Sequence, residues 1–161
     1  MSDKITMVQG INWALDDAMA EDEKVLVLGE DVADHTGGGV VGVTRGLSGK
    51  YGRERVVSTP ISETGFTGAA IGAAMMGFKP VVEIMLMNFM TVCSDMIVNH
   101  AAKLRFMSGG QTSVPMVIRT MTGPGFGSGG QHSDFMEGWY AHTAGLKVVI
   151  PSTPADAYGL M

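Results

Sequence analysis

The segment from residue 59 to residue 68 carries the side chain best placed to do chemistry, that of Glu63. Pro60 restricts the backbone just before an apparent helix, and Glu63 falls in the first turn of that helix. The helix dipole favours a carboxylate there, so Glu63 could be only a helix-start acid. However, it is the only ionisable residue between Arg55 and Lys79, and it closely follows a predicted strand, where ligands gather in parallel sheets. Spacing alone leaves both interpretations open.

A glycine-rich loop precedes a second candidate, His132. Residues 125–130 have the Gly-x-Gly-x-x-Gly spacing of a dinucleotide fingerprint. That function is rejected because the loop does not join a first strand to its helix, and no acid ends a strand about twenty residues later. We expect the loop instead to bring His132 to the end of a strand, which suits a catalytic histidine. A surface histidine is the alternative.

The remaining residue types exclude several classes of function. Cys93 is the only cysteine, so neither an intramolecular disulfide nor a cysteine-based zinc cluster can form, and we expect Cys93 to be buried packing. The histidines lack metal-ligand spacing, so no metal site is predicted. The formal net charge of −5 argues against nucleic acid. The polar start and the lack of a long apolar run predict a soluble, cytoplasmic protein without membrane contact.

Alternating helices and strands must position these candidates. The spacing predicts helices over residues 6–20, 62–77, 89–107, 134–143 and 153–161, with Ser62 and Thr153 as caps. It predicts strands over residues 25–28, 56–57, 80–86, 114–119 and 148–150. This order indicates an α/β domain spanning residues 1–161, with three α/β/α layers and a mainly parallel sheet. Ligands should collect at the carboxyl ends of the strands.

The helix predicted over residues 62–77 is unusually rich in small residues. It contains Gly65, Gly68, Gly72 and Gly77 among several alanines. Each glycine inside a helix costs about 1 kcal/mol relative to alanine, so a close approach by another backbone is expected. We favour contact with a helix of a partner chain. Close packing within the domain is the alternative.

Six short motifs occur in an order that resembles the beta subunit of thiamine-diphosphate-dependent 2-oxo acid dehydrogenases, including acetoin dehydrogenase. They are Gly29-Glu30-Asp31-Val32, Thr59-Pro60-Ile61-Ser62-Glu63, Asn88-Phe89, Asp95-x-x-x-Asn99-x-x-Ala102-Lys103, Gln131-His132-Ser133 and Gly145-Leu146-Lys147-Val148-Val149. The resemblance covers nearly the whole chain. It implies the thiamine-diphosphate-binding fold, specifically the transketolase-like pyrimidine-binding domain.

The resemblance also implies roles for four residues. Glu63 matches the catalytic glutamate that hydrogen-bonds N1′ of the cofactor's aminopyrimidine and so activates the cofactor. Phe89 matches an aromatic residue that packs on the pyrimidine ring. Glu30 matches a glutamate near the cofactor, in a chain of acids linking two active sites. His132 matches a histidine at the substrate end that helps to pass the acyl group to lipoamide.

The resemblance further implies partners. The family's diphosphate and Mg²⁺ motif, Gly-Asp-Gly followed by Asn, is missing here. In two-chain members it lies on an alpha subunit, so this chain should bind only the pyrimidine half and be inactive without that subunit. A second beta subunit, completing a heterotetramer, and a lipoyl acyltransferase core are the other expected partners. The family's second beta domain is expected to be absent after Met161.

The implied activity is cleavage of acetoin or decarboxylation of a 2-oxo acid, followed by acyl transfer to lipoamide. The loop at residues 38–47 and the stretch at residues 118–121 resemble acetoin dehydrogenase more than pyruvate or branched-chain dehydrogenases. Two alternatives remain. The chain could be a noncatalytic assembly module of such a complex, or part of a single-chain transketolase or deoxyxylulose phosphate synthase.

Overall fold

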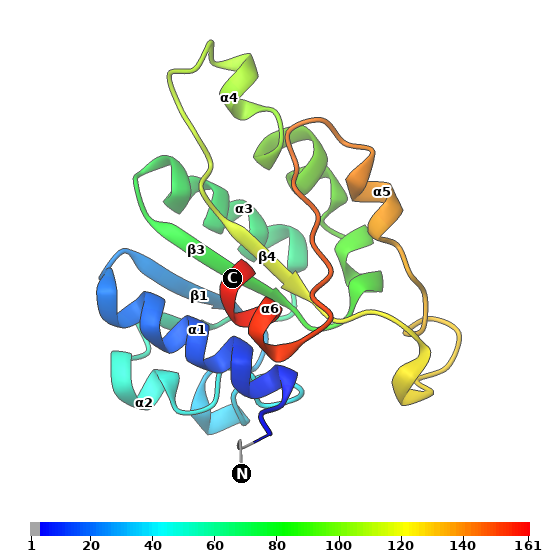
Figure 1. Ribbon diagram of the computed structural model, residues 1–161. Helices are drawn as coiled ribbons and strands as arrows, with labels where there is room; N and C mark the ends of the chain where they lie inside the picture. The colour runs from blue at the N-terminus through cyan, green and yellow to red at the C-terminus, as the bar shows by residue number, and fades with distance from the viewer. Residues whose placement is uncertain (1–3) are drawn as a thin grey trace.

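A computed structural model describes residues 4–161 of the chain. Its sheet has four strands in the order β2-β1-β3-β4 (Figure 1). The strands are β1 (Val25–Gly29), β2 (Val56–Ser58), β3 (Lys79–Ile84) and β4 (Val117–Thr120). Each neighbouring pair runs parallel. The predicted α/β class with a parallel sheet is therefore confirmed.

Helices cover both faces of this sheet (Figure 1). On one face α1 (Met7–Glu21) contributes Leu15 and Met19 to a core that includes Val27 and Val81. The short helix α2 (Leu47–Tyr51), which the sequence did not predict, adds to that core through Leu47. On the other face α3 (Glu63–Met75) packs on β3, in a second core that also takes in α5 (Glu137–Ala141). These two cores confirm the three-layer arrangement.

Local hydrogen bonds determine where α1 and the last helix begin. Thr6 caps α1, and its hydroxyl and backbone exchange hydrogen bonds with Gln9. Thr153 caps α6 (Pro154–Leu160) in the same way with Asp156. Such capping boxes satisfy backbone amides that a helix start leaves unpaired. The predictions of a helix after Thr6 and of a cap at Thr153 are thus confirmed.

The prediction of one regular helix over residues 89–107 is wrong. The chain instead forms a 3-10 turn, η2 (Met87–Thr91), a π-helical segment, η3 (Met96–Ala101), and a short α4 (Leu104–Met107). In η3 the Ala102 amide donates to the Ile97 carbonyl at 3.0 Å, five residues back. Apolar spacing of three or four residues is compatible with all three helix types, so the sequence pattern could not separate them.

Two other predicted elements also differ from the structure. Residues 148–150 form no strand and are not part of the sheet, and Val149 and Ile150 are 57% and 62% exposed. A β-branched run favours an extended backbone, but a strand also needs a hydrogen-bonding neighbour, which the run itself does not specify. The helix predicted over residues 134–143 shortens to α5 because residues 134–136 approach it as an irregular loop.

Across residues 4–161, every helix is too short or too polar to cross a bilayer.

The contact between α1 and α6 depends on Gly10. A β-carbon at Gly10 would lie 2.5 Å from the carbonyl oxygen of Pro154, a backbone atom that cannot easily move away. Nearby, the Tyr158 hydroxyl bonds to the Asp17 carboxylate at 2.6 Å. Close approach of the two helices therefore requires glycine at position 10.

We predict that Gly10→Ala lowers the free energy of unfolding by about 1–3 kcal/mol, because overpacking outweighs the gain in helix propensity. Gly72→Ala is the matched control. Its β-carbon would meet no atom within 4 Å, so the isolated domain should gain about 0.5–1 kcal/mol. Urea unfolding followed by circular dichroism measures both. Equal stabilisation by the two variants would contradict the close contact.

Candidate functional site

The carboxyl ends of the strands form one polar edge. Gly29 pairs with Ser58 on one side and with Glu83 on the other. The ladder continues by one residue, because the Thr59 amide donates to the Gly29 carbonyl at 2.9 Å. Glu30 and Thr59 therefore lie side by side just beyond β1 and β2. Side chains alternate between faces along a strand, so Glu30 points toward α3, opposite to Val27.

Glu63 is the first residue of α3, which begins beside this edge on one face of the sheet. Glu63 and Glu30 are only 7% and 8% exposed. Burial raises the pKa of Glu30, and the negative charges of Glu63 and Asp31 raise it further. The structure thus brings together two of the predicted site residues as a pair of buried carboxylates.

The start of α3 is held differently from our prediction. Ser62 occupies the cap position, but its side chain makes no capping hydrogen bond. Instead, the Thr64 hydroxyl donates to the Val92 carbonyl at 2.8 Å. The first turn of α3 is therefore tied to the chain that follows η2, and η2 carries Phe89.

Phe89 and His132 form the second pair of predicted residues that the structure brings together. Their ring centroids are 5.3 Å apart with an interplanar angle of 59°. The Asn88 side-chain amide donates to Asp134 at 3.0 Å, and the Thr122 hydroxyl donates to the Asp134 carbonyl at 2.5 Å. These bonds hold the glycine-rich loop against η2. The loop thus places His132 beside an aromatic ring, as a tilted aromatic pair.

Buried polar atoms without partners reveal residues that the sequence did not single out. Three are the hydroxyls of Thr59, Thr67 and Thr120, which accompany Glu30 Oε1 and His132 Nδ1. Thr59 directly follows β2, Thr120 is the last residue of β4, and Thr67 lies one turn after Glu63. Buried polar groups are normally hydrogen-bonded, so this concentration indicates a place for a polar ligand or water. The sequence cue was weak, because a lone threonine rarely signals a site.

The charged side chains on the opposite face of the sheet pair with each other and not with Glu30 or Glu63. Arg119 makes a buried bidentate ion pair with Glu83, its direct neighbour in the ladder. Glu83 lies two residues after Val81 and therefore shares the α1 face. Over residues 4–161, neither Glu30 nor Glu63 makes an ion pair, and no three His, Cys, Asp or Glu side chains are grouped to hold a metal.

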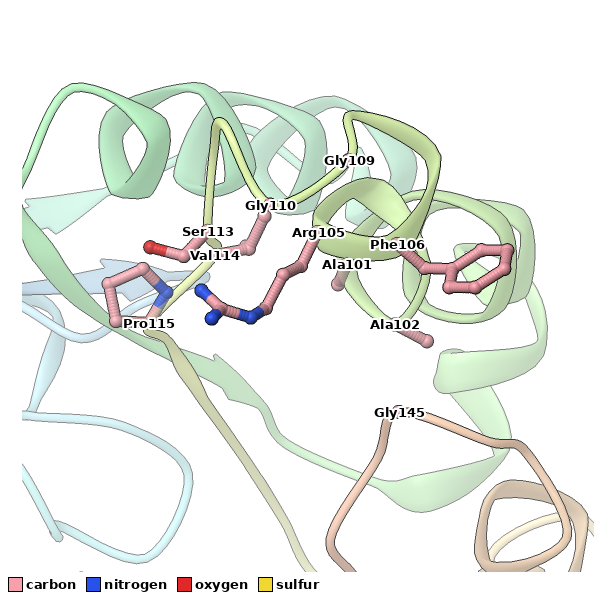
Figure 2. Close-up of a pocket in the computed structure, with 10 residues that line it drawn as sticks. All are labelled: Ala101, Ala102, Arg105, Phe106, Gly109, Gly110, Ser113, Val114, Pro115 and Gly145. Carbon is pink, nitrogen blue, oxygen red and sulfur yellow. The ribbon is translucent and has the colours of Figure 1, made fainter.

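One hollow lies elsewhere, near the amino end of β4 (Figure 2). It has a volume of about 710 Å³, and the Arg105 side chain extends into it toward Ser113 and Pro115. None of the four predicted site residues lines it. The candidate site is therefore a polar edge rather than an enclosed cavity within this chain.

The raised pKa of Glu30 predicts a stability that depends on pH. The folded state favours the neutral carboxyl, so its contribution is complete below the ordinary value of 4.5 and is lost as pH rises through the folded pKa. Glu30→Gln stays neutral. The free energy of unfolding of this variant, relative to the wild type, should therefore increase as pH rises from the ordinary pKa to the folded pKa of Glu30. The increase should be about 1.4 kcal/mol for each unit between these two pKa values.

Asp16→Asn is the control of opposite sign. Hydrogen bonds from Lys50 and Tyr51 lower the pKa of Asp16, so its contribution is present at neutral pH and lost in acid. Urea unfolding between about pH 2.5 and about pH 8, a range that extends below ordinary carboxyl values, compares the three proteins. Parallel curves for the Glu30→Gln variant and the wild type would rule out the raised pKa.

Comparison with known proteins gives a consistent picture. Residues 3–161 match the family model described as transketolase, pyrimidine binding domain. The beta subunit of acetoin:2,6-dichlorophenolindophenol oxidoreductase from Cupriavidus necator is 46% identical over 169 residues, covering 100% of this chain and 50% of that protein. The beta subunit of 3-methyl-2-oxobutanoate dehydrogenase from Mycobacterium tuberculosis (strain H37Rv) is 47% identical over 161 residues, covering 100% of this chain and 46% of that protein.

The mitochondrial pyruvate dehydrogenase E1 component subunit beta of Pisum sativum is 48% identical over 158 residues, covering 98% of this chain and 44% of that protein. The chain thus spans about half the length of the relatives it matches. The family model matches nearly the whole chain, and the parallel sheet agrees with it. The chain belongs to the transketolase pyrimidine-binding domain family.

Proposed function

We propose that this chain is the pyrimidine-binding domain of the beta subunit of a thiamine-diphosphate-dependent dehydrogenase, and that Glu63 is its catalytic carboxylate. The observation that carries the proposal is the burial of Glu63 beside Glu30, where α3 begins at the carboxyl edge of a parallel sheet. Burial and the charge of Glu63 raise the pKa of Glu30, so this edge favours a bound proton, as expected of a site that handles protons.

The residues present fit the aminopyrimidine end of this cofactor. Glu63 would hold a proton at ring atom N1′, and the ring of Phe89 offers a flat apolar contact. Glu30 Oε1 and the Thr59 hydroxyl are buried polar atoms still without partners. When bound, thiamine diphosphate supplies a reactive thiazolium carbon that stabilises the negative charge formed when a bond next to a carbonyl breaks. The chain's own part is to orient the pyrimidine and control its proton.

His132 is proposed as a catalytic group at the substrate end of the site. Its ring lies beside Phe89, and its Nδ1 is buried without a partner. A neutral imidazole presents one donor and one acceptor, so it can hold the substrate's oxygen and move a proton. We infer that His132 handles a proton beside the ring of Phe89.

The rest of the cofactor and the other partners are also part of the proposal. A separate alpha subunit would hold the diphosphate and Mg²⁺, a second beta subunit would complete a heterotetramer, and a lipoyl acyltransferase core would receive the acyl group. We propose that the chain forms one domain of a longer beta subunit in the cytoplasm. Acetoin is the favoured substrate and a 2-oxo acid the alternative, since relatives named for each are about equally identical.

A noncatalytic assembly module is the second candidate. The observation that favours it is the small-residue face of α3, where Gly72 is exposed and a β-carbon added to it would meet no atom within 4 Å. Such a face permits close approach by a helix from another chain. In that case Glu63 would contribute only to the start of α3, and its charge would not affect turnover.

We predict that Glu63→Gln in the full-length beta subunit, reconstituted with its alpha partner, lowers kcat by roughly 10²–10⁴-fold, the usual contribution of a general acid–base group. Turnover of acetoin, pyruvate and branched-chain 2-oxo acids is measured with an artificial electron acceptor, and assembly by gel filtration. Glu23→Gln, at an exposed position, is the control and should keep wild-type activity. Near-normal kcat for Glu63→Gln in an intact assembly would support the assembly module instead.

We also predict that the chain by itself binds thiamine diphosphate weakly or not at all, because the groups expected to hold the diphosphate lie on another subunit. Titration calorimetry of the isolated domain with thiamine diphosphate and Mg²⁺ measures this. Adding the alpha subunit to the full-length beta subunit should create tight binding. A micromolar dissociation constant for the isolated domain would contradict the split site.

A further inference from the structure

Thr67 carries a hydroxyl that the fold leaves unused. The residue is fully buried, and its Oγ1 has no hydrogen-bond partner within the part of the chain that the structure describes. A threonine inside a helix commonly donates to the carbonyl three or four residues earlier. Thr67 does not do so. Its donor therefore remains available in a buried environment, which is uncommon unless a ligand, a water or a moving side chain uses it.

The position of Thr67 on α3 directs it toward Glu63. The two residues are four apart, so they are neighbours on one face of the helix, and both belong to its buried face. Side chains on a helix lean toward its amino terminus, so Thr67 covers the turn that carries Glu63. Glu63 is the only ionisable residue of α3 and so the only one within reach along that helix.

The surroundings of Cys93 support the same placement. This thiol is fully buried and donates to the Met90 carbonyl at 3.6 Å, so its hydrogen bond is made without Thr67. Burial raises the pKa of Cys93, the adjoining Thr67 hydroxyl opposes that change, and the Glu63 carboxylate adds to it. Thr67 lies beside the sulfur without forming a geometrically satisfactory hydrogen bond. Thr67 and Cys93 therefore lie side by side, close to the turn that carries Glu63.

A second contact keeps this arrangement in place. The bond from Thr64 to the Val92 carbonyl ties the first turn of α3 to the residue just before Cys93. η3 packs directly beside Gly68, since a β-carbon at this position would lie 3.4 Å from the Met96 sulfur. The two segments thus form a fixed support behind Glu63.

We propose that Thr67 is a positioning residue for Glu63. Its hydroxyl, which has no partner among the described residues, donates through one buried water to the Glu63 carboxylate and holds that carboxylate toward the polar edge of the sheet. The inference rests on the proposed role of Glu63 in activating the cofactor. It adds a residue that touches neither cofactor nor substrate but sets how accurately the carboxylate is aimed.

The test uses Thr67→Val and Thr67→Ser in the full-length beta subunit assembled with its alpha partner. Valine keeps the shape but lacks the hydroxyl. We expect kcat to fall about tenfold with KM unchanged, the size of one hydrogen bond to a charged group. Serine keeps the hydroxyl and should restore kcat to within about threefold of the wild type. Exchange of the proton on the cofactor's reactive carbon, measured by quenched NMR, should slow by the same factor as kcat.

Thr44→Val is the structural control. The Thr44 hydroxyl is equally buried but donates to the Val32 carbonyl at 2.6 Å in the other core. Its loss should lower the midpoint of thermal unfolding while kcat and proton exchange stay unchanged. Thr67→Ala is a second hydroxyl-free variant that cannot overpack the site. It should reproduce the loss of kcat even if the valine variant fails to assemble.

Three results would overturn the inference. Wild-type kcat in an assembled Thr67→Val or Thr67→Ala variant would show that the hydroxyl is not used. Equal loss in the serine and valine variants would assign the effect to packing. A rise in KM with constant kcat would assign it to binding. Each can occur while Glu63→Gln remains inactive, so the inference can fail without the proposed function failing.

Discussion

The parallel pairing of β1 with both β2 and β3 is the constraint on which the rest of the site depends. Because the three strands run the same way and in register, their carboxyl ends meet at one edge, and their side chains share faces. That register places Glu30 beside Thr59 and turns both toward α3. A register shift of one residue would send Glu30 to the α1 face, away from Glu63.

The edge holds two buried carboxylates, and over residues 4–161 neither of them makes an ion pair. Glu30 and Glu63 are both buried, and Arg119, the arginine buried in the sheet, is already engaged by Glu83 on the opposite face. Burial and the neighbouring charge of Glu63 therefore both raise the pKa of Glu30. A folded domain tolerates this arrangement at a cost to stability, and that cost is understandable if the edge exists to handle protons.

Segments far apart in the chain complete the edge through a few specific bonds. The Asn88–Asp134 bond holds the loop bearing His132 against Phe89, and the bond between Thr64 and Val92 ties that region to α3. Several buried polar atoms nevertheless remain unpaired, among them the hydroxyls of Thr59 and Thr67. The domain therefore presents a polar edge whose unpaired buried atoms would be satisfied by a ligand or by water.

The sequence by itself determined the α/β class, the parallel sheet, the helix start at Thr6 and the burial of Cys93, because hydrophobic period and capping chemistry are local properties. It also named Glu63 and His132 as candidates. Only the tertiary structure decided that Glu30 adjoins Glu63, that residues 148–150 lie outside the sheet, and that the helix expected over residues 89–107 is irregular. Strand pairing, burial and unused hydrogen-bond donors depend on which segments contact each other in space. Local sequence patterns do not specify those contacts.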